Sequence, residues 1–139
     1  MGSEMCIRDS YPMMRYPWDR TEAALRAMAD HGDGVVPELH YVNPETGADV
    51  LPTMGFTAMM LAAGKTTTPP RRSCSSAFHV VAGRGRTTID GQTVEWGPKD
   101  TFSAPVFASL RHEADEEAFL VRIHDRPLQE KLGYYEERE

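Results

Sequence analysis

The sequence has few cysteines, no long apolar stretch and no excess of positive charge. Two cysteines among 139 residues are too few for a disulfide framework, which favours a reducing compartment and predicts a cytoplasmic protein. No run approaches the roughly 18 apolar residues of a membrane span, and the N-terminus lacks the apolar segment of a signal peptide. The formal net charge of −6 opposes nucleic-acid binding, because an acidic surface repels phosphate groups. We therefore expect neither a nucleic-acid partner nor a membrane.

The remaining composition is that of one ordinary folded domain. Hydrophobic residues make up 40% and charged residues 26%, and this length suffices for a core. The first ten residues, MGSEMCIRDS, follow neither a helix nor a strand period and resemble a translated sequencing adaptor. We expect residues 1–10 to be a disordered, artefactual leader and residues 11–139 to form the domain. The natural protein would then continue upstream; a disordered natural terminus is the alternative.

Hydrophobic spacing predicts one helix near each end and short strands between them. Asp19, with Glu22 three residues later, predicts a capped helix over 20–31 that ends at Gly32 and Gly34. Asp90-Gly91 predicts a hairpin between residues 86–89 and 92–95. Further strands are predicted at residues 39–42, 54–62, 77–82, 101–104, 109–113 and 118–123. Strands at intervals of about eight to twelve residues indicate a small β-sandwich or barrel.

The sequence also predicts a loop within the strand-rich region and a helix after it. Residues 66–72, with Pro69-Pro70, suggest an extended loop. Asp125 suggests the start of a terminal helix that ends at Gly133, with Pro127 in its first turn. Residues 134–139 are charged and we expect them to be peripheral.

Several residues match the pattern of a known barrel. Gly64 and Gly83 stand at the spacing of the two glycines in the motif G-x5-H-x-H-x3,4-E-x6-G. Pro105 stands at the proline of G-x5-P-x-G-x2-H-x3-N, near Gly97 and Asp100. The predicted hairpin lies between the two. These segments resemble the two motifs of the cupin barrel. The resemblance predicts an all-β fold, a cupin (double-stranded β-helix, jelly-roll-like) barrel with short N- and C-terminal helices.

Flanking segments narrow the resemblance to one family. They are YVNPETG at 41–47, LPTMG at 51–55, FHVVAGRGR at 78–86 and DRPLQEKLG at 125–133. Over residues 11–137 the chain resembles the C-terminal cupin of gentisate 1,2-dioxygenases, with salicylate and 1-hydroxy-2-naphthoate dioxygenases as close relatives. The resemblance implies a two-cupin, Fe(II)-dependent enzyme that inserts both atoms of O2 into an aromatic ring. In that family the N-terminal cupin holds the iron, and this chain corresponds to the other half.

The resemblance also locates the positions where a cupin would hold metal. They fall at Pro70, Arg72 and Ser76 in the first motif and at Leu110 in the second. None of these side chains can replace an imidazole as an iron ligand, and Arg72 would bring a cation where a cation should bind. We therefore expect no metal ligand and no catalytic residue in this chain, with Fe(II) in the missing N-terminal cupin.

The histidines offer one other route to a metal. By alternation along the strand, Phe78 and Val80 should face inward and His79 should face away, as a packing or interface residue. His112 shares the strand face of Leu110 and should be solvated or hydrogen-bonded. A metal moved to His40, His79 and His112 would need a cluster that no spacing supports.

Arginines, serines and a cysteine are the remaining candidates. A basic group of Arg71, Arg72, Arg84 and Arg86 could bind a carboxylate. Alternatively, it could be surface charge paired with Asp90, Glu95 or a partner domain. Cys74 lies in a serine-rich loop without an evident His–Asp partner, and its serines lack the G-x-S-x-G context of a hydrolase. A nucleophile is therefore not predicted.

These observations favour a metal-free, C-terminal cupin half of a gentisate 1,2-dioxygenase-like enzyme. Its role would be structural, with the missing N-terminal half and further copies of itself as partners in a homo-oligomer. It would not cleave the ring alone. Two alternatives stay open: a stand-alone cupin that binds a small organic acid through Arg72 and its neighbours, and a metalloenzyme with unusual ligands. The sequence does not distinguish gentisate, salicylate and hydroxynaphthoate as the aromatic acid.

Overall fold

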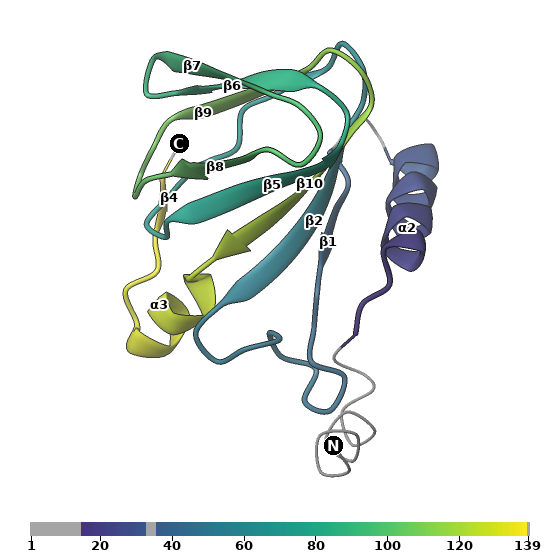
Figure 1. Cartoon of the computed structure of the whole chain (residues 1–139). Coiled ribbons are helices and arrows are strands. Elements are labelled where there is room, and N and C mark those ends of the chain that lie inside the picture. Colours follow the sequence, from purple (N-terminus) through teal and green to yellow (C-terminus); the bar gives the residue numbers. More distant parts are fainter. Residues whose placement is uncertain (1–14, 33–35, 139) are drawn as a thin grey trace, which may run out of the picture.

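Two antiparallel sheets face each other to form a barrel (Figure 1). The computed structural model describes residues 15–32 and 36–138. The five-stranded sheet has the order β1 (Glu38–His40), β2 (Gly55–Leu61), β10 (Ala118–His124), β5 (Ser76–Ala82), β8 (Thr101–Ala104). The four-stranded sheet has the order β3 (Thr66–Thr67), β9 (Leu110–Ala114), β6 (Gly85–Ile89), β7 (Gln92–Trp96). The expected all-β architecture is confirmed.

Alternation along the strands places the main core between the sheets. In β10, Ala118 and Leu120 belong to the cluster inside the barrel, whereas Phe119 belongs to a second cluster on the outer face. The same alternation puts Phe78 and Val80 inside and His79 on the opposite face of β5, as predicted. The inner cluster consists of Met59, Leu61, Phe78, Val80, Trp96, Ala104, Ala108, Leu110, Ala114, Ala118 and Leu120.

Helix α2 (Trp18–His31) covers part of the outer face of the five-stranded sheet (Figure 1). Its Leu25 is fully buried in the outer cluster with Ala58, Met60 and Phe119. The helix is as expected, but the predicted capping box is wrong. Pro17 takes the N-cap position in an extended conformation without a side-chain cap, and Asp19 lies inside the first turn. At that position the negative charge of its carboxylate interacts favourably with the positive end of the helix dipole.

The predicted hairpin is confirmed as β6 and β7. Asp90 and Gly91 both have positive φ, 47° and 86°, which is typical of the tight turns that match strand twist. The Asp90 carboxylate also accepts a hydrogen bond from the backbone N–H of Ser109 at 2.8 Å. The turn is therefore fixed to the start of β9 as well as by its own backbone.

Helix α3 (Arg126–Leu132) follows β10 and ends at Gly133 in the left-handed conformation, as predicted. Asp125 occupies the N-cap position, but its carboxylate accepts the backbone N–H of Ser75 at 3.1 Å instead of capping the helix.

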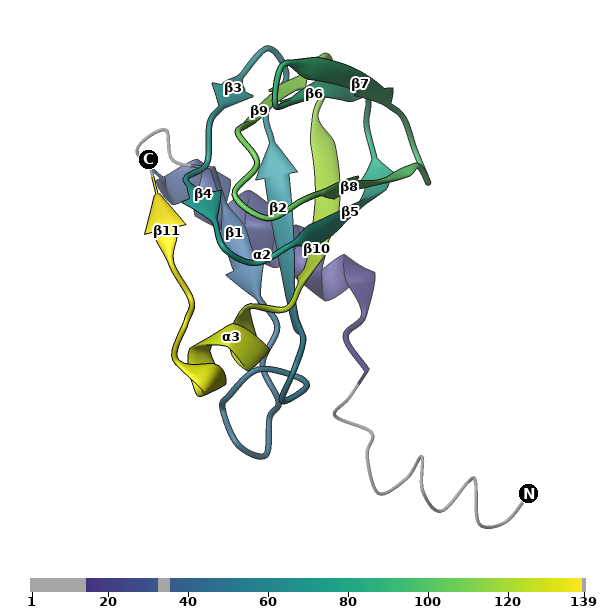
Figure 2. The same ribbon diagram turned by 90° about the vertical axis from the view of Figure 1, so that its left-hand side faces the viewer.

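One expectation about loops is wrong: residues 66–72 contain two strands, β3 (Thr66–Thr67) and β4 (Arg71–Arg72). In the segment expected to be peripheral, residues 137–138 are exposed but form a further short strand, β11 (Glu137–Arg138). Figure 2 shows β11 beside β4, and the two pair in antiparallel register. The short strands β3 and β4 form because each pairs with a strand distant in sequence: β3 pairs with β9, and β4 pairs with β11.

Some expectations fall outside the described residues: the leader at 1–10, the role of Gly34 and the position of residue 139. Of the helices that the structure describes, none is long and apolar enough to cross a membrane.

Candidate functional site

The barrel interior contains a group of buried polar side chains in addition to its apolar core. They come from the inward-facing positions of four strands and are all buried: Thr57 on β2, Thr87 on β6, His112 on β9, and Arg122 and His124 on β10. Arg122 is aligned with Thr57 on one side and Phe78 on the other. The ring of Phe78 in turn lies edge-on to His112, with centroids 5.1 Å apart. This neighbourhood is the candidate site.

His112 is held neutral at the end of a hydrogen-bond chain. The indole N–H of Trp96 donates to the Thr87 hydroxyl at 2.9 Å, and that hydroxyl lies 2.8 Å from Nδ1 of His112. Since an indole can only donate, the Thr87 proton is free to be donated to Nδ1. Burial, followed by the charges of Arg72 and Arg122, lowers the pKa of His112 to about 4. His112 is thus a buried, hydrogen-bonded residue and not a solvated one.

Two guanidinium groups lie close to this histidine. Arg122 is 2% exposed, and its pKa is lowered by burial and then by the charge of Arg72. The Arg72 side chain is 14% exposed, and its nearest carboxylate partner is Glu137, at 3.8 Å from Nε. Nε of Arg72 and Nη1 of Arg122 are buried without a hydrogen-bond partner among the described residues.

A second polar chain runs through β1, β2 and β10. Nδ1 of His40 lies 2.8 Å from the Thr57 hydroxyl, which lies 3.3 Å from Nε2 of His124. Burial, and then the nearby cation Arg122, lowers the pKa of His124 to about 3. A side chain at Gly55 would collide with this imidazole, since its Cβ would lie 2.5 Å from Cε1 of His124. The glycine therefore makes room for His124.

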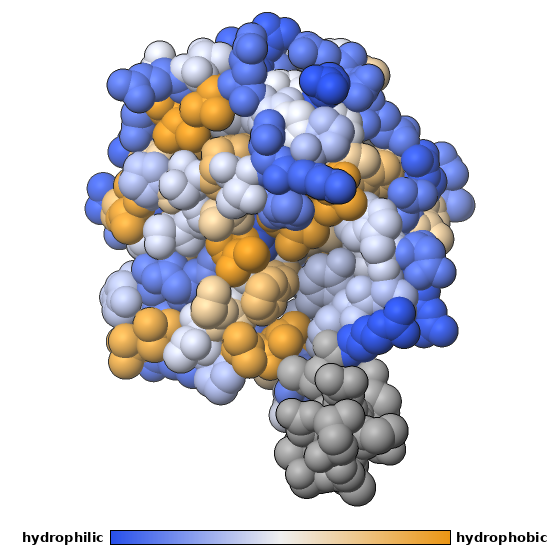
Figure 3. Space-filling view, in the orientation of Figure 1, coloured by the Kyte–Doolittle hydropathy of each residue, from blue (hydrophilic) through white to orange (hydrophobic). Residues whose placement is uncertain are grey.

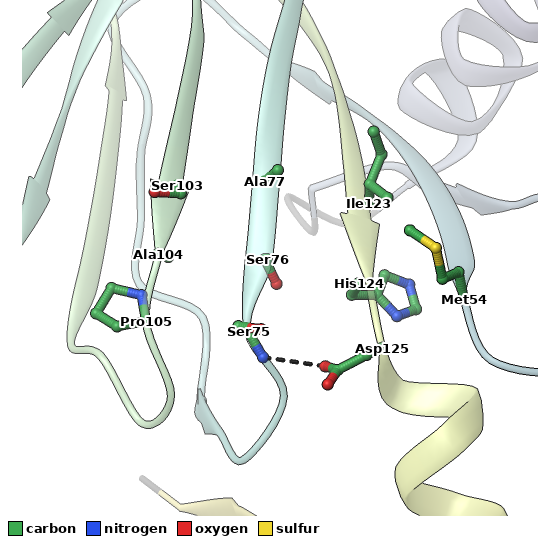
Figure 4. Close-up of a pocket in the computed structure, with 10 residues that line it drawn as sticks. All are labelled: Met54, Ser75, Ser76, Ala77, Ser103, Ala104, Pro105, Ile123, His124 and Asp125. Carbon is green, nitrogen blue, oxygen red and sulfur yellow. Dashed lines mark hydrogen bonds between the residues drawn. The ribbon is translucent and has the colours of Figure 1, made fainter.

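The positions at which the family motifs would hold iron do not fit a metal. Pro70 is exposed outside the strands, and Leu110 packs in the inner core. Arg72 contributes a cation, and Ser76 lies near Asp125 at the lower end of β5 (Figure 4). Within residues 15–32 and 36–138, no three His, Cys, Asp or Glu side chains are grouped as metal ligands would be. The donor chemistry at these four positions is not that of an Fe(II) site.

The structure does not bring His40, His79 and His112 together. His79 faces outward and makes a 3.0 Å contact with the Thr101 hydroxyl, whereas His112 is inside the barrel. His40 contacts only the hydroxyl chain through Thr57 among its described partners. The three imidazoles therefore have different partners and do not form a metal-binding cluster.

The predicted basic group is also divided. Arg86 pairs with Asp115 at 2.8 Å and with Glu113 at 3.8 Å on the outer surface, whereas Arg72 turns inward. Arg71 donates to the carbonyl of Phe107 at 2.9 Å, and Arg84 is exposed. Arg86 lies opposite Glu113 on β9 and Glu95 on β7, but its ion pairs among the described residues are with Glu113 and Asp115. The predicted partners Asp90 and Glu95 are therefore wrong for this arginine.

The serine-rich loop has a structural function. The Ser73 hydroxyl donates to the side-chain oxygen of Gln129 and accepts the backbone N–H of Glu136 at 2.8 Å. This attaches the C-terminal segment to the start of β5. Cys74 is 3% exposed, and burial raises the pKa of its thiol, so the reactive thiolate is disfavoured.

A cavity of about 590 Å³ opens on the outer face of the five-stranded sheet (Figure 4). Ala77 and Ile123 form its apolar floor, and Met54, Ser75 and Asp125 line its lower rim. A second cavity of about 330 Å³, lined by Phe56 and Val121, adjoins it on the same face. Figure 3 shows hydrophobic residues gathered over β10 and its neighbours on this side.

No protein-family model matches the chain, but curated proteins do. It is 36% identical to a 5-aminosalicylate 1,2-dioxygenase of Comamonas over 94% of its own length. It is 38% identical to a gentisate 1,2-dioxygenase of Ralstonia over 92% of its length. The salicylate 1,2-dioxygenase structure from Pseudaminobacter salicylatoxidans superposes with a TM-score of 0.82 over 88% of the chain, at 29% identity.

The chain is a cupin domain homologous to part of the gentisate 1,2-dioxygenases. It spans little more than a third of these relatives, 36% and 37% of the curated proteins and 38% of the solved chain. The expected fold and family are therefore confirmed for this cupin domain.

The sequence analysis does not identify Arg122, which at 2% exposure is the most buried Lys or Arg among the described residues. The segment AFLVRIH at 118–124 has the pattern of an apolar strand, which hides its single arginine. One signal was available: Arg122 follows Ala118 and Leu120 at alternate positions, which are the inward ones.

Proposed function

We propose that this domain is the C-terminal, metal-free cupin half of a gentisate 1,2-dioxygenase-type enzyme and that its role is structural. In the whole protein an upstream cupin would hold Fe(II) and support the oxidation of gentisate or a related aromatic acid by O2. The span of about a third of the relatives' length supports a larger enzyme of which this is one part. The domain would act in the cytoplasm.

The observation that carries the proposal is the replacement of imidazole by a guanidinium. Arg72 stands where the family motif would place a metal ligand, and a second cation, Arg122, is buried nearby. A divalent cation would be repelled by both charges in a low-dielectric interior. Iron chemistry in this barrel is therefore disfavoured on electrostatic grounds, independently of the missing donors.

The outer face of the five-stranded sheet supports the structural role. Phe56, Val121 and Ile123 are half-buried on this face, and Met54 and Val50 lie at its edge. Apolar positions gathered around two adjoining cavities are typical of a surface that another part of a protein covers. We assign this face to the contact with the rest of the enzyme, and with further copies in a homo-oligomer.

The test is an activity and metal measurement on the purified chain. With Fe(II), O2 and gentisate or salicylate, we expect no oxygen consumption and no ring-opened product. After chelation we expect no stoichiometric iron. A full-length gentisate 1,2-dioxygenase in the same assay is the positive control. Turnover by the chain, or one tightly held iron per chain, would refute the proposal.

A further inference from the structure

Arg122 is a buried charge that lacks its counter-charge. Its side chain is 2% exposed on the inner face of β10, and Nη1 has no hydrogen-bond partner in the described part of the chain. None of the ion pairs within 4.0 Å among those residues includes it. An isolated buried cation is strongly destabilising, so such a group is normally paired.

Arg72 adds a second cation, and its ion pair with Glu137 is a long one. Its Nε is buried and unpartnered among the described residues, and its carboxylate neighbour Glu137, at 3.8 Å, is too distant for a hydrogen bond. The Arg72 side chain is 14% exposed and Arg122 is 2% exposed, and each has a buried nitrogen without a hydrogen-bond partner among the described residues. The charge of Arg72 also lowers the pKa of Arg122 and of His112.

The surrounding groups do not supply the missing negative charge. His112 is neutral, and burial favours the neutral thiol of Cys74. Among the described residues, Glu38 on β1 is a carboxylate whose charge supports the protonated form of Arg122, and it makes no ion pair with Arg122 within 4.0 Å. Thr57 and Phe78, the register neighbours of Arg122, are uncharged.

We propose that Arg72 and Arg122 together bind a small carboxylate inside the barrel. A guanidinium presents a planar fork of N–H donors that matches the two oxygens of a carboxylate. Burial strengthens this attraction, because it excludes water. The site reverses the charge preference of a cupin metal centre: it takes an anion where the family motifs would hold a cation. It requires neither the upstream half nor catalysis.

Thermal unfolding of the chain in acetate and in chloride, at equal ionic strength and pH, tests this site. We expect acetate to raise the midpoint by about 5 °C over a hundredfold concentration range, because a ligand that binds only the folded state stabilises it. The variants Arg72→Gln and Arg122→Met should lose this acetate-specific rise. Arg71→Gln is the matched control: it lies beside Arg72 on β4 but is exposed, and it should keep the full rise.

A second measurement does not depend on the folding of any variant. In the ¹⁵N spectrum of the unmodified chain, the Nε–H signals of Arg72 and Arg122 should shift with acetate, and that of Arg71 should not. Equal midpoints in acetate and chloride, or a full acetate effect in either interior variant, would refute the site. Unchanged Nε–H signals of Arg72 and Arg122 would do so as well.

Discussion

At the scale of single residues, His112 should make the stability of the domain depend on pH. The pKa of His112 is lowered from 6.5 to about 4 by burial and by two guanidinium groups. The unfolded chain therefore takes up a proton below pH 6.5 that the folded chain refuses until about pH 4, and stability falls as the pH drops through this window. A shift of this size corresponds to at most roughly 3 kcal/mol.

The variant His112→Gln isolates this contribution. Glutamine does not titrate and can still accept the hydrogen bond from Thr87, whereas His124 is retained in both proteins. Urea unfolding at pH 7 and pH 4.5 should give a smaller difference in unfolding free energy for the variant than for the parent. An equal difference in both proteins would show that His112 does not control this pH dependence.

At the scale of structural elements, two glycines of the β6–β7 hairpin should respond differently to alanine. A Cβ at Gly91 would meet no atom within 4 Å, but the residue has a φ of 86°, so Gly91→Ala should cost about 1 kcal/mol through backbone conformation. A Cβ at Gly85 would lie 2.2 Å from the Glu113 carbonyl and 2.7 Å from the Trp96 ring. Gly85→Ala should therefore cost about 3 kcal/mol or more, since rigid neighbours must move.

Denaturant unfolding of the two variants measures this contrast under identical conditions. Gly91→Ala acts as the control for adding a methyl group to the hairpin without a collision. Similar losses of unfolding free energy in the two variants would contradict the close contact between β6, β9 and the Trp96 ring.

The elements that sequence could predict are those whose signals are local. The Asp90-Gly91 turn, the alternation in β5 and β10, and the end of α3 at Gly133 all depend on a few neighbouring residues. The strands β3, β4 and β11 depend on partners distant in sequence, and no local pattern announces them. The interior site depends on both kinds of signal. The alternation along β10, a local pattern, predicts that Arg122 faces inward, whereas only the fold brings Arg72 into the same interior.

At the scale of the whole molecule, the domain has one outer sheet face that its own helices do not cover completely. Helix α2 buries Ala58, Met60 and Phe119, whereas Val121 and Ile123, further along β10, line cavities. In the proposed enzyme the remaining polypeptide covers this face. In the isolated chain the described residues leave this part of the face open, so contact between copies is the expected substitute.

We therefore expect the purified chain to self-associate through this face, and Ile123→Glu to weaken that association at least about tenfold, because a carboxylate buried in an apolar contact is costly. Val94→Glu is the matched control, since Val94 is 37% exposed on β7 in the opposite sheet. Sedimentation velocity over a range of concentrations measures the effect, and thermal unfolding verifies that both variants fold. A chain that stays monomeric at high concentration, or equal weakening by the two substitutions, would exclude this face as the contact surface.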